Sequence, residues 1–196
     1  LITIKDSDTD TDVSDAVEIT LNGSSVSCSS SSVAINGSEI TISSGGSYVI
    51  NGTLDDGRII VDADDAKVHL ILNGVSIHSE TSAAIYVKSA DKTTITLADG
   101  TDNTLSDSSN YTYDDTDKEE PDAVLFSKDD LSINGEGSLT IEASFNNGIT
   151  CKNDLKIISG TINVTAKNNA IKGKDSLSIT GGTITASAEG KGLLSN

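Results

Sequence analysis

Hydrophobic and polar residues alternate along most of this chain, in short runs separated by turns rich in Gly, Asn, Asp and Ser. Alternation with a period of two predicts β-strands that bury one face. The pattern recurs every 22 residues, because Ile149, Ile171 and Leu193 stand at the same point of successive units. Three strands in so short a unit leave no room for a helix. In the unit that begins at Gly148, the alternating pairs are Ile149/Cys151, Leu155/Ile157 and Ile162/Val164.

A fixed period of this length is typical of stacked repeats. We predict an all-β protein, a single-stranded parallel β-helix (solenoid) of about seven coils that forms one domain over residues 1–196. Asn-Gly pairs recur between the predicted strands, and in a solenoid we expect them to form left-handed corners. The competing fold is a hairpin-rich sandwich, for which Asn-Gly is also a signal. The pairs begin at Asn22, Asn36, Asn51, Asn73 and Asn134.

Two acidic segments interrupt the repeats. Residues 1–16 form an acidic N-terminal segment, which we expect to be solvated. Residues 106–122 form an inserted loop that contains the single proline, Pro121. We expect this insertion to project from the stack, either as a solvated loop or as a ligand-binding loop. The last residues open another coil at Leu193, so we expect the native chain to continue past Asn196 or to be capped there.

Acidic residues outnumber basic residues by 30 to 13, which gives a formal charge of −17. This charge repels a phosphate backbone, so we expect no nucleic-acid partner, and it favours hard cations such as Ca²⁺. No apolar run approaches the roughly 18 residues of a membrane span, so we expect no membrane partner. Cys28 and Cys151 fall at inward-facing positions, where free thiols are expected rather than a disulfide. A surface rich in Ser, Thr and Asn suggests export.

Carboxylates and amides recur in the turns, and stacking converts one such residue per coil into a column. Coils about 4.8 Å apart bring these oxygens close together, so the carboxylates repel one another unless a cation neutralises them. Ca²⁺ takes about six to eight oxygen ligands, which adjacent coils can share. The alternative is that these side chains only cap turns by bonding to the backbone. The predicted metal ligands are Asp122, Asp129, Asp130, Asp154, Asn147, Asn153, Asp91, Asp62 and Asp64.

Lysines cluster on one side of the C-terminal coils, where together with Ca²⁺ they can engage the carboxylates of a uronic acid polymer. The alternative is that these lysines only balance nearby aspartates. Two tyrosines of the insertion are candidates for stacking on sugar rings, although a chain without Trp offers a thin aromatic surface. The predicted carbohydrate-binding residues are Lys128, Lys152, Lys172, Lys174, Tyr111 and Tyr113.

A long stretch of the chain resembles a bacterial family of secreted carbohydrate-binding β-helix proteins, related in fold to pectate lyases. The stretch reads DADDAKVHLILNGVSIHSETSAAIYVKSADKTTITLADGTDNTLSDSSNY and continues later as DAVLFSKDDLSINGEGSLTI. The resemblance implies a right-handed coil, bound Ca²⁺, a secreted protein at the bacterial cell surface, and non-catalytic binding of plant cell-wall polysaccharides. Related sequences often read Asp-Gly-Ile where this chain has Asn147-Gly148-Ile149 and Asn169-Ala170-Ile171, which puts metal binding at those two levels in doubt.

The function that we expect is therefore non-catalytic, calcium-assisted binding of polygalacturonate or pectin, with cellulose as a second candidate. The alternatives are a calcium-dependent pectate lyase and a structural cell-surface module. Similar lyases use an arginine as the base, and this chain has a single one, Arg58, beside Asp55 and Asp56. We expect these carboxylates to keep Arg58 charged in a structural ion pair, which makes it unfit as a base.

Overall fold

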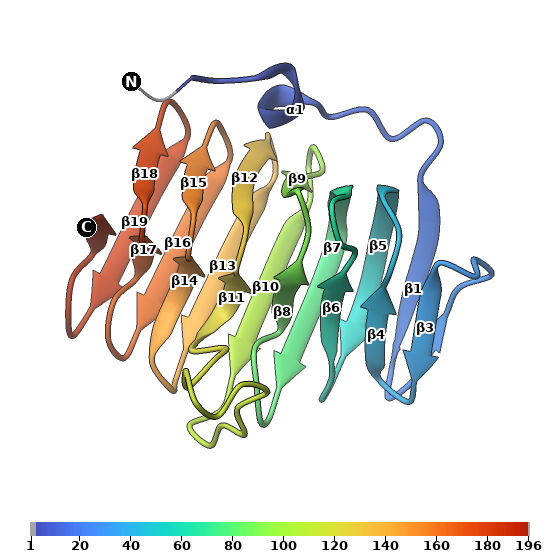
Figure 1. Ribbon diagram of the computed structural model, residues 1–196, viewed down its shortest axis with the longest axis horizontal. Helices are drawn as coiled ribbons and strands as arrows, with labels where there is room; N and C mark the ends of the chain where they lie inside the picture. Colours follow the sequence, from blue (N-terminus) through green and yellow to red (C-terminus); the bar gives the residue numbers. More distant parts are fainter. Residues whose placement is uncertain (1–2, 196) are drawn as a thin grey trace.

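A computed structural model describes residues 3–195, so Leu1, Ile2 and Asn196 lie outside the described residues. The protein is all-β, with mostly parallel strands in curled sheets and one helical turn near the N-terminus (Figure 1). The elements are α1 (Asp6–Thr9), β1 (Val17–Gly23), β2 (Val26–Ser27), β3 (Val33–Asn36), β4 (Glu39–Ile42), β5 (Gly46–Leu54), β6 (Arg58–Asp62), β7 (Lys67–Ser79), β8 (Ile85–Ser89), β9 (Lys92–Leu97), β10 (Asp102–Asp107), β11 (Ala123–Ser127), β12 (Asp130–Gly135), β13 (Ser138–Ala143), β14 (Asn147–Cys151), β15 (Asp154–Ile157), β16 (Thr161–Ala166), β17 (Ile171–Gly173), β18 (Ser176–Ile179), β19 (Thr183–Ala188) and β20 (Leu193–Ser195).

The strands form two sheets. Sheet A runs in the order β18-β15-β12-β9-β7-β10-β13-β16-β19, with β5, β1 and β2 joined beside β7. Sheet B runs in the order β20-β17-β14-β11-β8-β6-β4-β3. Sheet A curls at β7, because the first half of this strand pairs with β9 and its second half pairs with β10. Gly74, with a φ of 80°, lies at the bend.

The strand register follows the repeat of the sequence. Ile149 pairs with Ile171 in sheet B, and Leu155 pairs with Leu177 in sheet A, so neighbouring strands come from segments 22 residues apart. Parallel pairing of this kind keeps each inward residue above its equivalent in the next unit. The predicted repeat is therefore confirmed as a strand register.

Three of the five Asn-Gly pairs form the predicted left-handed corners. Gly52, Gly74 and Gly135 have φ values of 96°, 80° and 93°, and each lies within or at the end of a parallel strand. The prediction is wrong for the first two pairs. Gly23 and Gly37 lie in antiparallel connections, between β1 and β2 and between β3 and β4. β1 nevertheless pairs in parallel with β5 from Val17 onwards, as the predicted start of the repeats requires.

The hydrophobic core lies between the sheets and is made of the inward-facing Ile, Leu and Val residues. Cys151 is buried and Cys28 is half-buried, and both thiols are free, as expected. A separate small cluster lies on the outer face of sheet B and consists of Ala83, Tyr86, Ala123 and Phe126. Within the described part of the chain, no helix is long and apolar enough to cross a membrane.

Candidate functional site

Four lysines form a row along the outer face of sheet B. Val87, Ser127, Cys151 and Gly173 are aligned by strand pairing, so the lysine that follows each of them lies in register with the next. Neighbouring strands are about 4.8 Å apart, which sets the spacing of the row. The lysine row consists of Lys88, Lys128, Lys152 and Lys174. Lys88 is not among the predicted binding residues, although its place after Val87 in the repeat is the signal that identifies it.

A second row of outward-facing side chains lies beside the lysine row, and its side chains change from apolar to polar along the sheet. Strand pairing aligns its members, beginning with apolar and aromatic side chains and ending with a hydroxyl and an ammonium group. The Tyr86 and Phe126 rings meet edge to face, with centroids 5.8 Å apart, and both residues are buried. The row consists of Ile60, Tyr86, Phe126, Thr150 and Lys172.

The insertion lies over this outer face, which the prediction of a projecting loop did not anticipate. Arg58 donates two hydrogen bonds to the carboxylate of Asp114, at 2.6 and 2.9 Å. Glu120 is buried and pairs with the ammonium groups of both Lys128 and Lys152. The insertion therefore places its own carboxylates where sheet B presents cations.

The ion pairs of Arg58 also correct the partners that we expected for it. Glu39 and Asp114, rather than Asp55 and Asp56, hold the guanidinium group. The hydrogen bond from Arg58 to Asp114 raises the pKa of Arg58 above its usual value. This arginine is thus a structural cation, and the conclusion that it is unfit as a base holds.

The two tyrosines of the insertion are half-buried and take part in internal packing. The Tyr111 ring stacks on Phe145 with centroids 4.1 Å apart, and its hydroxyl donates to Asp107. Burial beside the Asp107 carboxylate raises the pKa of Tyr111. Tyr113 meets Phe145 edge to face at 6.1 Å. Tyr113 is therefore the better placed of the two to stack on a sugar.

Two of the predicted metal ligands, Asp122 and Asn147, belong to a hydrogen-bonded ladder at the edge of sheet B. Asn147 donates from Nδ2 to Oδ2 of Asp122 at 3.1 Å, and Asn169 donates to Oδ1 of Asn147. The backbone register places Ala123, not Asp122, opposite Asn147, so the alignment of the repeats is shifted by one residue here. These contacts show that amide side chains link successive units.

Asp122 is the unusual member of this ladder. Its second oxygen, Oδ1, is buried and has no hydrogen-bond partner among residues 3–195, and the same is true of Oγ1 of Thr150. Burial raises the pKa of Asp122, while the positive charges of Lys172 and Lys152 act in the opposite direction. The hydroxyl of Thr150 also lowers the pKa of Asp122, so these two oxygen-bearing side chains lie next to each other close to the end of the insertion.

The other predicted metal ligands are largely engaged in turn capping and ion pairs. Asp130 accepts from the backbone N–H of Asp154 at 3.3 Å, and Asp154 accepts from the Ser176 hydroxyl at 2.6 Å. Asp129 accepts from the backbone N–H of Ala90, Asp62 pairs with Lys88, and Asp64 accepts from the Ser89 hydroxyl. The last two predicted ligands differ in exposure, since Asp91 is exposed and Asn153 is half-buried. Among residues 3–195, no three His, Cys, Asp or Glu side chains gather into a group that can hold a metal ion.

The remaining predicted lysines lie side by side at the C-terminal end of sheet B, Lys174 in the lysine row and Lys172 in the neighbouring row. Lys172 is half-buried and Lys174 is exposed. Neither forms a salt bridge with another residue in the described range 3–195. The other three lysines of the row are paired with carboxylates of the protein, Lys88 with Asp62 and both Lys128 and Lys152 with Glu120.

Comparison with known proteins identifies the family. A family model described as "Carbohydrate-binding domain-containing protein" matches residues 36–196, and the chain belongs to this family. A curated protein of the same description from Acetivibrio thermocellus is 45% identical over 135 residues, which cover 68% of this chain and 47% of that protein. The chain therefore spans about half the length of this curated relative.

A solved structure agrees with this assignment. It is described as the polysaccharide lyase-like protein from C. thermocellum, in a gadolinium derivative. The two chains are 32% identical, with a TM-score of 0.81 and coverage of 92% of this chain and 94% of the other. Membership of a family named for carbohydrate binding fits a non-enzymatic protein with a polysaccharide partner.

Proposed function

We propose that this protein binds an acidic plant cell-wall polysaccharide, polygalacturonate or pectin, without cleaving it. The observation that carries the proposal is the lysine row of sheet B. A uronic acid polymer bears a carboxylate on each sugar, so a row of ammonium groups about 4.8 Å apart can engage several carboxylates along one chain. Glu120 already pairs with two lysines of this row, which supports its capacity to hold carboxylates. Cellulose, a neutral polymer, is the second candidate ligand.

We propose Ca²⁺ as the partner ion of this surface. A chain with a formal charge of −17 repels a polyanion unless cations lie between them. Asp122 offers a buried carboxylate oxygen and Thr150 a buried hydroxyl beside it, both donors of the type that Ca²⁺ prefers. Ca²⁺ would supply positive charge to the uronate carboxylates. The similar lyase-like structure took up gadolinium, which is also a hard cation, and this is consistent with oxygen-rich sites on the fold.

The finer description of the fold belongs to the same proposal. Strands that pair in parallel with partners one repeat away support a right-handed parallel β-helix of about seven coils. A secreted protein at the bacterial cell surface is the setting in which a plant polysaccharide is accessible. In such a β-helix, the lysine row would run along one outer face, with one lysine from each successive coil.

The experiment is a pull-down with insoluble polygalacturonate in the presence of Ca²⁺ or of a chelator, with cellulose as the neutral comparison. We expect retention on polygalacturonate with Ca²⁺ and its loss with the chelator. Binding that a chelator leaves unchanged would remove Ca²⁺ from the mechanism. Retention on cellulose alone would overturn the preference for an acidic polymer.

A calcium-dependent lyase is the alternative, because the similar solved structure is described as lyase-like. Such a reaction needs a base that removes the proton beside the uronate carboxylate. Arg58, with Glu39 and Asp114 as partners, is held in its charged form. We therefore expect no rise in absorbance from unsaturated uronate products at alkaline pH with Ca²⁺, and a steady rise would establish the lyase instead.

A further inference from the structure

The acidic N-terminal segment lies on the outer face of sheet A, although we expected it to be solvated. It runs from Thr3, beside β15, past α1 and β12 towards β1 (Figure 1). Asp8 is 0% exposed, and it lies between two lysines that are themselves 7% and 6% exposed, Lys92 and Lys156. The segment therefore covers a polar face of the sheet and buries charges there.

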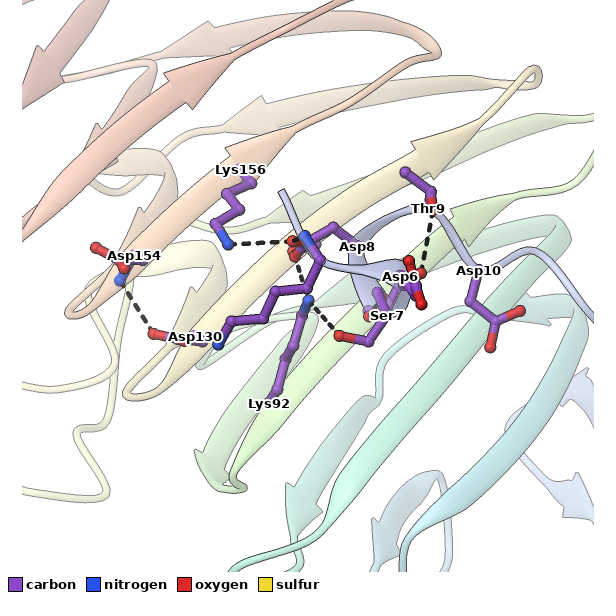
Figure 2. A network of polar contacts seen from close by, with 12 residues as sticks. Asp6, Ser7, Asp8, Thr9, Asp10, Lys92, Asp130, Asp154 and Lys156 are labelled. Atoms are coloured by element: carbon purple, nitrogen blue, oxygen red, sulfur yellow. Dashed lines mark hydrogen bonds and ion pairs between the residues drawn. The ribbon is translucent and has the colours of Figure 1, made fainter. Parts of the chain in front are cut away.

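The Asp8 carboxylate is bound at both of its oxygens (Figure 2). Oδ1 accepts from the ammonium group of Lys92 and from the hydroxyl of Ser132 at 2.6 Å. Oδ2 accepts from the ammonium group of Lys156 at 3.1 Å and from the backbone N–H of Lys5 at 2.6 Å. Three of these four donors belong to the sheet rather than to the N-terminal segment.

The sheet fixes the geometry of these donors. Thr94, Ser132 and Lys156 lie directly across from one another on β9, β12 and β15, and Lys92 is two residues before Thr94 on the same face of β9. Adjacent strands are about 4.8 Å apart, so a carboxylate above the middle strand is within reach of side chains from both neighbours. The arrangement of Lys92, Ser132 and Lys156, which we term the sheet A carboxylate site, is set by strand pairing.

The surroundings of the sheet A carboxylate site are hollowed and carry both polar and apolar groups, among them the carboxylate of Asp10 and the side chain of Val68. Thr94 donates to the carbonyl of Ser7 at 2.9 Å, and Asn134 donates to the carbonyls of Asp8 and Asp10 at 3.0 and 2.8 Å. A cavity of about 170 Å³ adjoins Lys92. It is lined by hydroxyl, imidazole and ammonium groups that include those of Ser47, Lys67, His69 and Thr94.

The N-terminal segment is held here by polar contacts. The hydrophobic core that the structure describes begins at Val17 and Ile19 and includes no residue of the range 3–16. The segment contributes one carboxylate to two buried lysines, and Asp130 of β12 lies directly across from Lys92 on the same face. A ligand that brings its own carboxylate and hydroxyl groups can therefore replace every type of contact that the segment makes.

We propose that Lys92, Ser132 and Lys156 form a second carboxylate-binding site, for which Asp8 is the internal ligand and a uronate carboxylate of an oligosaccharide is the competing ligand. The chemical class of this ligand rests on the proposed function, whereas the site itself is separate from the lysine row of sheet B. Hydroxyl groups of the sugar would take the bonds that Thr94 and Asn134 now make to backbone carbonyls. The N-terminal segment thus acts as a removable cover.

The test is calorimetric titration of the full chain with trigalacturonate in a chelator, which suppresses any calcium-dependent binding. Asp8→Asn removes the internal carboxylate, and Asp6→Asn is the matched control, because Asp6 is an exposed residue of the same helical turn. We expect Asp8→Asn to bind at least about ten-fold more tightly than the wild type and Asp6→Asn, which is the size of effect that charge-assisted bonds support. Adding Lys156→Gln to Asp8→Asn should abolish the gain.

Two further readouts identify the site. A synthetic peptide of residues 3–12 should displace trigalacturonate from the Asp8→Asn protein, and cellotriose should not bind in its place. In the wild type, saturating trigalacturonate should raise the amide hydrogen exchange of residues 5–10 at least about ten-fold, which keeps the test valid if a variant fails to fold. Unchanged exchange in the wild type, or no gain in folded Asp8→Asn, would overturn the proposal.

The outcomes also separate this site from the lysine row. If the lysine row does not bind the polysaccharide, neither Ca²⁺ nor the Lys174→Gln substitution will change the affinity of the protein for oligogalacturonate. If the sheet A carboxylate site does not bind the ligand, Asp8→Asn will not bind trigalacturonate more tightly than the wild type in a chelator. A gain in Asp8→Asn that survives Lys156→Gln would place the new binding elsewhere and would also overturn the proposal.

Discussion

Two acidic segments of this protein cover two faces of the stack, and each places a carboxylate between two lysines. The insertion brings Glu120 to Lys128 and Lys152 on sheet B. The N-terminal segment brings Asp8 to Lys92 and Lys156 on sheet A. Lys128 and Lys152 follow two neighbouring strands, β11 and β14, whereas Lys92 and Lys156 lie on the two strands that flank β12. Parallel stacking therefore produces pairs of cations that a single carboxylate can bridge.

The two segments differ in what else holds them. The insertion has aromatic contacts, with Tyr111 stacked on Phe145, and it lies over the Tyr86–Phe126 pair. Residues 3–16 make no contribution to the described core and rely on hydrogen bonds and ion pairs. Apolar burial is insensitive to salt and to charge changes, whereas polar contacts can be exchanged for those of a ligand. We infer that the insertion is a fixed part of the fold and the N-terminal segment a replaceable one.

The largest expected change in the free energy of unfolding comes from removing a buried aromatic side chain beneath the insertion. Phe126→Ala empties a fully buried position beneath the insertion and should lower the free energy of unfolding by about 3–5 kcal/mol. Urea denaturation measures this loss, with Tyr113→Ala at a half-buried position as the comparison. A loss in Phe126→Ala no larger than that in Tyr113→Ala would mean that aromatic packing does not fix the insertion.

The next effect concerns the N-terminal segment. Asp8→Asn leaves two buried ammonium groups with no carboxylate, which costs about 3–5 kcal/mol if they stay buried. The segment can avoid this cost by leaving the sheet, so we expect local release with little change in the melting temperature. Tryptic cleavage after the exposed Lys5 should accelerate at least about ten-fold. A cleavage rate equal to that of Asp6→Asn would contradict the polar attachment of this segment.

The two segments should respond to pH in opposite directions. Burial alone raises the pKa of Asp8, but hydrogen bonds from Lys92 and Ser132 outweigh it and hold this pKa well below the usual range. Its stabilising effect is therefore complete above about pH 4, the pKa of an unfolded aspartate, and is lost only at lower pH. At the end of the insertion, burial raises the pKa of Asp122, so its effect on stability becomes less favourable as pH rises above about 4.

Asp122→Asn tests this pH dependence. The amide keeps the ladder to Asn147 and carries no charge to bury, so in a chelator the variant should be more stable than the wild type at pH 7 by about 0.5–2 kcal/mol. The difference should vanish near pH 3. Thermal unfolding from pH 3 to 7 measures both. If Asp122 is also a Ca²⁺ ligand, the variant should lose the rise in melting temperature that Ca²⁺ gives the wild type.

The smallest expected effect is at the exposed end of the insertion. Asp114→Asn weakens a bidentate pair with Arg58 in which the Asp114 side chain is 36% exposed. Pairs with this exposure contribute about 0–1 kcal/mol, so chemical denaturation should detect little change. A loss above about 2 kcal/mol would show that charge, rather than apolar packing, fixes the insertion.

The regular part of the molecule could be predicted from the sequence because strand alternation and the 22-residue period determine the register directly. The docking of the two acidic segments could not. Nothing local distinguishes Asp8 from its acidic neighbours, since its partners lie 84 and 148 positions away. Lys88 could have been found from its place in the repeat. The position of Asp122 relative to Asn147 could not, because paired residues of β11 and β14 are 24 positions apart rather than the 22 of the regular repeat.

The central claim is that the lysine row of sheet B binds an acidic polysaccharide. Calorimetric titration of oligogalacturonate, with Ca²⁺ present, into the Lys172→Gln/Lys174→Gln variant tests it most directly, because these lysines form no salt bridge within residues 3–195. We expect at least about ten-fold weaker binding. Lys167→Gln, on an exposed lysine paired with Glu189, should bind as the wild type does. Equal affinities for all three proteins would contradict the account.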